Sequence, residues 1–172
     1  MADAVKKLLA LDANVPLDLA DGNSQVISFH AEFLKRGYSL CIAPTALQEM
    51  SFLSENGDDR EKALAIDALE HLLEWKIIPF NLIPVGHGLT ERFAEALIKR
   101  NLLPEDECND GMILAETALA KIPVLVTSDK HLLQIDPDQL KVACDDCGLA
   151  HVAAVHPFRF YRAISRIPMP SK

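Results

Sequence analysis

The hydrophobic residues of this chain alternate between short continuous runs and longer runs with helical spacing. The short runs Leu8–Leu11, Ser39–Ala43 and Val124–Val126 are each followed by proline or by polar residues, which is typical of buried strands. Between them lie apolar residues at helical spacing, for example in Gln25–Lys35 and Glu107–Lys121. Strand-like runs that alternate with helical ones predict βαβ units and a parallel sheet.

Caps and turn residues divide the rest of the chain into further elements. No repeat, low-complexity tract or linker interrupts the pattern, so we expect one compact α/β domain over residues 1–172. The predicted elements are a helix from the N-cap Ser24 to Gly37, helices from Thr45, from Asp58 and Asp59, and from Thr90 to Arg100, a strand at Lys76–Pro79, a short helix from Lys130, an apolar stretch at His151–Val155, and a C-terminal helix from Pro157.

Composition narrows the class of protein. Hydrophobic residues make up 49% and charged residues 24% of the chain, which is ordinary for a globular protein. No apolar run approaches the roughly 20 residues of a membrane span, and the first residues lack a signal-peptide pattern. Four cysteines are too few for a disulfide scaffold. We therefore expect a cytoplasmic protein without a membrane segment.

The charge is distributed unevenly. The net charge is −8, but residues 151–172 hold Arg159, Arg162, Arg166 and Lys172 without an acidic residue, so they carry +4 and the first 150 residues carry −12. An acidic body can hold metal ions while a basic segment contacts phosphates. On this hypothesis the three arginines bind nucleic acid. A solvated tail that balances charge is the alternative.

Four acidic residues occupy positions where chemistry gathers in α/β proteins. Asp12 and Asp129 each follow a predicted strand, Glu49 lies one helical turn past the end of another, and Asp110 lies near the start of a helix. The carboxyl ends of parallel strands meet at one edge of a sheet. If the strands are neighbours, we expect all four carboxylates to converge there.

Converging carboxylates favour a bound divalent cation. Their mutual repulsion raises their pKa values, and Mg²⁺ or Mn²⁺ removes that penalty because hard cations take oxygen ligands. Water on such a cation can attack a phosphodiester. Taken singly, each residue has an ordinary explanation as a turn, a cap or a solvated helix residue. The joint placement is what points to a metal site.

The order of these pieces resembles the PIN-domain family, from Leu8 to about Phe160. The resemblance implies a three-layer α/β/α sandwich with a mostly parallel, Rossmann-like sheet, and metal-dependent endoribonuclease activity. Its acidic ligands map onto Asp12, Glu49, Asp110 and Asp129, with supporting groups at Asn14, Thr127 and Ser128. Bacterial members are often toxins, which implies a small antitoxin partner. The matching segments are Leu11–Asn14, Ile42–Glu49, Asn109–Ala115, Val126–Leu133 and a closing turn at His156.

The chain departs from the family pattern after its last aspartate. Many members have a further acidic residue there, whereas this chain has Lys130 and His131, which puts a second metal in doubt. A PIN-fold binding module without activity and a metal-dependent phosphohydrolase of small molecules therefore stay open as alternatives. A homodimer is also open, because cyclic dimers predominate among soluble oligomers. Cys144 and Cys147 have zinc-like spacing, but the residues that follow do not fit a zinc finger.

Overall fold

The computed structural model describes residues 7–82 and 87–168. Within these ranges one sheet of five parallel strands has the order β3-β2-β1-β4-β5. All five strands are parallel, but the chain adds β2 and β3 on one side of β1 and β4 and β5 on the other, so the strand order reverses between β1 and β4. Such a reversal opens a crevice at the carboxyl edge, where α/β folds bind ligands. The strands are β1 (Lys7–Leu11), β2 (Tyr38–Ile42), β3 (Ile77–Pro79), β4 (Val124–Val126) and β5 (Ala153–Val155).

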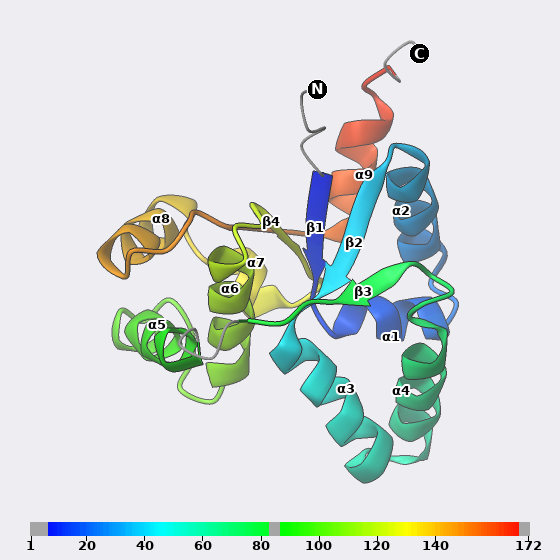
Figure 1. The fold of residues 1–172 in the computed structure, drawn as a ribbon, viewed down its shortest axis with the longest axis horizontal. Coiled ribbons are helices and arrows are strands. Elements are labelled where there is room, and N and C mark those ends of the chain that lie inside the picture. The colour runs from blue at the N-terminus through cyan, green and yellow to red at the C-terminus, as the bar shows by residue number, and fades with distance from the viewer. Residues whose placement is uncertain (1–6, 83–86, 169–172) are drawn as a thin grey trace.

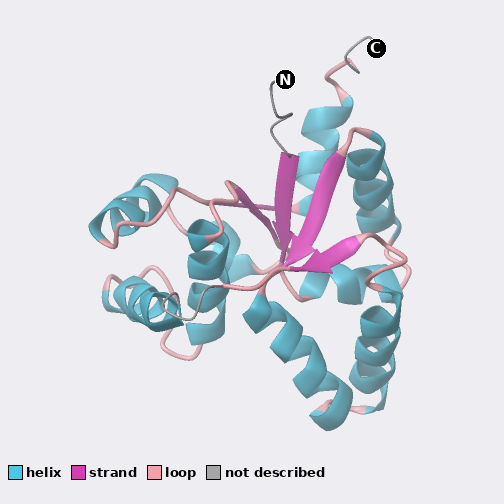
Figure 2. Cartoon of the chain, viewed as in Figure 1, coloured by secondary structure: helices cyan, strands magenta, loops and turns pink. Residues whose placement is uncertain are grey.

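Helices lie on both sides of this sheet (Figures 1 and 2). On one side α2 and α9 pack together, and on the other α6 packs on β4 and α5. The helices α3 and α4 form a hairpin that projects beyond the carboxyl edge (Figure 1). The helices are α1 (Asn14–Ala20), α2 (Ser24–Lys35), α3 (Pro44–Asn56), α4 (Asp59–His71), α5 (His87–Lys99), α6 (Cys108–Leu119), α7 (Lys130–Gln134), α8 (Pro137–Asp146) and α9 (Pro157–Ser165).

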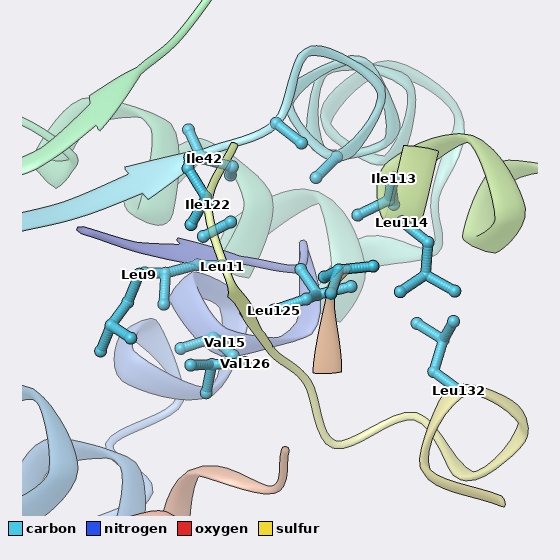
Figure 3. Packing of buried hydrophobic residues seen from close by; sticks show 14 of the residues in the cluster. Leu9, Leu11, Val15, Ile42, Ile113, Leu114, Ile122, Leu125, Val126 and Leu132 are labelled. Carbon is cyan, nitrogen blue, oxygen red and sulfur yellow. The ribbon is translucent and has the colours of Figure 1, made fainter. Parts of the chain in front are cut away.

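The core lies between the sheet and its two helical layers. Leu11, Ile42 and Leu125 on the central strands are fully buried, as are Ile113 and Leu114 of α6. Figure 3 shows these side chains packed around the ends of β1 and β4. Strands covered on both faces read as continuous apolar runs, which is why the strands could be seen in the sequence. The predicted three-layer α/β/α fold with a parallel sheet is confirmed.

The close contact between α5 and α6 depends on one glycine. A Cβ added to Gly111 would lie 2.8 Å from both the Cα and the Cβ of Ala94, which is closer than carbon atoms pack. The helices can approach this far only because Gly111 has no side chain. This contact fixes the first turn of α6, and with it the neighbouring residue Asp110.

Four sequence expectations differ from the structure. The N-cap of α2 is Asn23, not Ser24, because the Asn23 side chain accepts from the N–H groups of Gln25 and Val26. Thr90 does not cap a helix, because α5 already begins at His87 and Thr90 is buried within it. Two helices, α1 and α8, were not predicted. Helix α8 has the N-cap Asp136 and a proline in its first turn, so the signals of its start were present. No helix in the described part of the chain is long and apolar enough to cross a membrane.

Candidate active site

Asp12 and Thr127 lie side by side at the carboxyl edge, where the strand order reverses. Leu11 pairs with Val126 as the last residues of β1 and β4. The Asp12 N–H then donates to the Val126 carbonyl at 3.0 Å, and the Thr127 N–H donates to the Val155 carbonyl at 3.0 Å. The sheet ladder therefore continues past the strands and fixes the backbone of both residues.

The Asp12 carboxylate is buried and held by three donors. Its Oδ1 accepts from the Ala13 N–H at 2.7 Å, and its Oδ2 accepts from Thr127 Oγ1 at 2.6 Å and from Asn14 Nδ2 at 2.7 Å. Burial raises the pKa of Asp12, the bonds from Thr127, Ala13 and Asn14 oppose that rise, and the nearby Asp129 charge adds to it. These contacts leave the side chain little freedom to rotate.

The predicted supporting groups Asn14, Thr127 and Ser128 connect Asp12 to Asp129. Thr127 Oγ1 accepts from the Asp129 N–H at 2.9 Å and from Asn14 Nδ2 at 3.2 Å. The Asn14 Oδ1 accepts from the Ser128 N–H at 3.1 Å, so Ser128 takes part through its backbone. Thr127 is completely buried. This network makes the two loops after β1 and β4 one rigid unit.

Asp129 is the N-cap of α7. Its Oδ1 accepts from the N–H groups of His131 at 2.7 Å and Leu132 at 3.1 Å. The capping role that we considered as the ordinary explanation is therefore present. It uses one carboxylate oxygen, and the negative charge of Asp129 still raises the pKa of both Asp12 and Asp110.

Glu49 and Asp110 approach this edge from α3 and α6. Burial raises the pKa of Glu49 to about 7; the Asp12 charge adds to the rise, and a hydrogen bond from Asn109 opposes it. Burial raises the pKa of Asp110 to about 8, and the charges of Asp12, Asp129, Glu107 and Glu49 raise it further. Each of the three other predicted carboxylates therefore acts on Asp110.

Asp110 also carries a polar atom that the protein leaves unsatisfied. The residue is 8% exposed, and its Oδ2 is buried without a hydrogen-bond partner. Buried polar atoms almost always have a partner, and an unpaired carboxylate oxygen is costly. An oxygen donor without a partner, next to several other carboxylates, fits a hard divalent cation. Asp12, Glu49, Asp110 and Asp129 stay the predicted ligands, and their side chains would have to move closer around an ion, because no three of them offer ligand atoms within 4.8 Å of one another among the described residues.

Two acidic residues of the site were not singled out from the sequence. Glu116 of α6 is 1% exposed and accepts from the Thr45 N–H at 3.0 Å and from Thr45 Oγ1 at 2.7 Å, which ties α6 to the start of α3. Glu107 lies before α6, with its Oε1 3.0 Å from His131 Nδ1. A carboxylate inside the apolar run of α6 was a signal that could have revealed Glu116.

The basic C-terminal segment begins at the carboxyl edge of the sheet, where β5 ends, and runs back toward the amino edge. Helix α9 begins directly after β5, with His156 as its N-cap. Burial and the charge of Arg159 lower the pKa of His156, and the charge of Asp18 in α1 partly opposes this effect. At its other end the Ile167 carbonyl accepts from Arg36, which follows α2. Arg159, Arg162 and Arg166 are all exposed, but Arg159 is the one near the carboxyl edge.

Comparisons with known proteins agree with this architecture. No protein-family model matches the sequence, and no curated protein matches it. Solved structures do match. One is a chain from the structure of VapBC2 of Rickettsia felis bound to a DNA fragment from the VapBC2 promoter. It is 13% identical to this chain, with a TM-score of 0.59, and the match covers 87% of this chain and 98% of that one. The chain has a PIN-like fold.

A second structure with this fold supports the same conclusion. A chain of VapBC-1 from nontypeable Haemophilus influenzae is 13% identical with a TM-score of 0.55, again over 87% of this chain and 98% of that one. At such low identity the likeness concerns the fold. The PIN-like architecture predicted from the order of the sequence motifs is therefore confirmed, and the roles of individual residues rest on the geometry described above.

Proposed function

We propose that this protein is a Mg²⁺- or Mn²⁺-dependent endoribonuclease whose cation is held by Asp12, Glu49, Asp110 and Asp129. The observation that carries the proposal is the Asp110 carboxylate, with a buried and unpartnered oxygen at the carboxyl edge of a PIN-like sheet. A bound cation would stabilise charge on the phosphoryl oxygens and supply an activated water. The cytoplasm is where we expect the protein to act.

Asp12 and Glu49 would have different roles in the site. Asp12 is fixed by its three donors, so its carboxylate is oriented before substrate arrives, which is how preorganised sites lower a barrier. Glu49 is half-buried with a pKa of about 7. Because a ligand must be ionised to bind the cation, metal affinity should rise as the pH increases through about 7.

A groove beside Glu49 offers a place for the RNA strand. Its volume is about 470 Å³, and its walls come from α3 and α6. Phe52, one turn after Glu49, is 64% exposed in this groove, and exposed aromatic rings stack on unpaired bases. The arginines of α9, and Arg159 first among them, would contact phosphates farther along the strand. The exposed ring of Phe52 favours a single-stranded substrate.

A partner is proposed on the basis of the same likeness. The PIN-domain resemblance implies a small antitoxin, and the two solved structures described above are VapBC structures. We propose a partner of this kind, which would be tested by isolating the protein from cells in which it is expressed with its genetic neighbour. Recovery of the protein alone at stoichiometric expression would contradict the partnership.

Calorimetric titration with Mn²⁺ tests the metal site apart from activity. We expect wild-type protein at pH 8 to bind Mn²⁺, and Asp12→Asn to lose that binding while it stays folded. Asp18→Asn is the matched control, because Asp18 lies on α1 near the same edge but outside the proposed ligand set. Absence of Mn²⁺ binding by the wild type at millimolar metal would contradict the proposal.

A further inference from the structure

Glu107, Asp110 and His131 form a compact group of metal-ligand types. Each offers one ligand atom, and these atoms all lie within 4.8 Å of one another. His131 Nδ1 lies 3.0 Å from Glu107 Oε1. In the part of the chain that the structure describes, this is the one group of three histidine, cysteine or acidic residues that meets this spacing. Glu107 directly precedes α6, Asp110 lies in its first turn, and His131 lies in α7.

An ion pair between Glu107 and His131 does not account for the whole group. Such a pair needs two residues, but Asp110 is also within reach, is 8% exposed, and carries the buried Oδ2 that has no hydrogen-bond partner. A histidine ring nitrogen within 4.8 Å of oxygens from two carboxylates is the kind of mixed ligand set that transition dications take. The proposed catalytic cation rests on the same unpartnered oxygen, so Asp110 would bridge two ions, as a carboxylate with two oxygens can.

We infer that Glu107, Asp110 and His131 bind a first-row transition dication of the Zn²⁺ class, at a position distinct from the cation of Asp12 and Glu49. The imidazole nitrogen sets the preference, because imidazole suits zinc and its neighbours whereas Mg²⁺ takes oxygen ligands. This site shares Asp110 and its unpartnered oxygen with the proposed ribonuclease centre, but Glu107 and His131 belong to this site alone. Many family members have an acidic residue after the last aspartate, where this chain has Lys130 and His131. His131 would therefore supply a nitrogen ligand in place of a carboxylate oxygen.

The group needs only small movements to close on an ion. Two ligand atoms of a tetrahedral zinc, each roughly 2.0–2.1 Å from the metal, are about 3.4 Å apart. The Glu107–His131 separation of 3.0 Å is already close to that value. Both side chains are partly exposed, at 32% and 44%, so they are free to adjust around the buried Asp110. Three protein ligands leave a fourth position open for water, as in catalytic zinc sites.

Titration of the full chain with Zn²⁺ and with Mg²⁺ tests the site by calorimetry. We expect His131→Ala to weaken Zn²⁺ binding by about 100-fold or more, since even indirect partners of a metal contribute 10- to 100-fold, and to leave Mg²⁺ binding unchanged. Glu107→Gln should act in the same direction. His151→Ala is the matched control, because His151 also faces a carboxylate, 2.7 Å from Asp145 Oδ1, but belongs to no such group.

The Asp12→Asn variant separates this site from the ribonuclease centre. It removes a ligand of the catalytic cation but none of this group, so we expect Zn²⁺ binding that still depends on His131. That result would stand even if the protein failed to cleave RNA. Equal Zn²⁺ affinity in wild type and His131→Ala would overturn the inference. Thiolate-to-metal absorption on Co²⁺ binding would also overturn it, by placing the ion on cysteines.

Discussion

Replacing Asp110 with asparagine should stabilise the metal-free protein. The pKa of Asp110 is raised from 3.8 to about 8 by burial and by four neighbouring carboxylates. The folded state therefore binds a proton that the unfolded chain releases, so stability falls as pH rises from about 4 to about 8. Asparagine carries no charge and removes that dependence.

The size of the effect follows from the shift. The rise of the Asp110 pKa from 3.8 to about 8 corresponds to about 5–6 kcal/mol of unfolding free energy, at roughly 1.36 kcal/mol for each pH unit. Water that reaches the neighbouring carboxylates screens their repulsion. We therefore expect Asp110→Asn to be more stable than the wild type by about 1–3 kcal/mol at pH 8. In a chain of this length, that raises the melting temperature by roughly 2 to 12 °C.

Thermal unfolding followed by circular dichroism in EDTA measures this gain at pH 5 and at pH 8. We expect Asp110→Asn to melt above the wild type, with the larger difference at pH 8. Asp106→Asn is the control, because Asp106 lies four residues upstream and is exposed. With Mn²⁺ the order should reverse, because ligand binding stabilises only the protein that binds. A variant that melts below the wild type in EDTA at pH 8 would refute the reasoning.

Three further changes test the packing, the hydrogen-bond network and the basic helix. Gly111→Ala should cost about 1–3 kcal/mol in chemical denaturation, because the added methyl group overlaps Ala94; unchanged stability would show that α5 can move away. Thr127→Val should cost about 1–3 kcal/mol and weaken Mn²⁺ binding, because Asp12 loses a donor; unchanged metal affinity would make this contact dispensable. Arg159→Gln should flatten the dependence of log RNA affinity on log salt by about 0.7, and Arg166→Gln by less; equal slopes in both would argue against a phosphate role graded by distance from the site.

The fold was readable from the sequence because its strands are buried on both faces. Val124–Val126 and Leu8–Leu11 appear as apolar runs for that reason, and the predicted β4 bounds agree with the structure. The N-cap roles of Asp58 and His156 reflect local hydrogen bonds, which the sequence contains directly. Thr90 was misassigned because a threonine inside a helix looks the same as one at its start.

The sequence predicted only part of the site, because the order of residues does not show which of them lie close together in the fold. Asp12 and Asp129 were found from their positions after strands, and the structure brings Asp110 under the influence of both. The contact between Glu107 and His131 spans 24 residues and depends on how α6 and α7 approach each other. No local pattern encodes that approach. The assignment of the four carboxylates as ligands stays a prediction.

Cleavage of a fluorescently labelled single-stranded RNA by the purified protein tests the central claim most directly. The reaction would be run with Mn²⁺, with EDTA, and with Asp12→Asn and Asp18→Asn in place of the wild type. We expect internal cleavage by the wild type and by Asp18→Asn with Mn²⁺, and none with EDTA or by Asp12→Asn. Cleavage that persists in EDTA, or that Asp12→Asn retains, would contradict a metal-dependent ribonuclease built on these carboxylates.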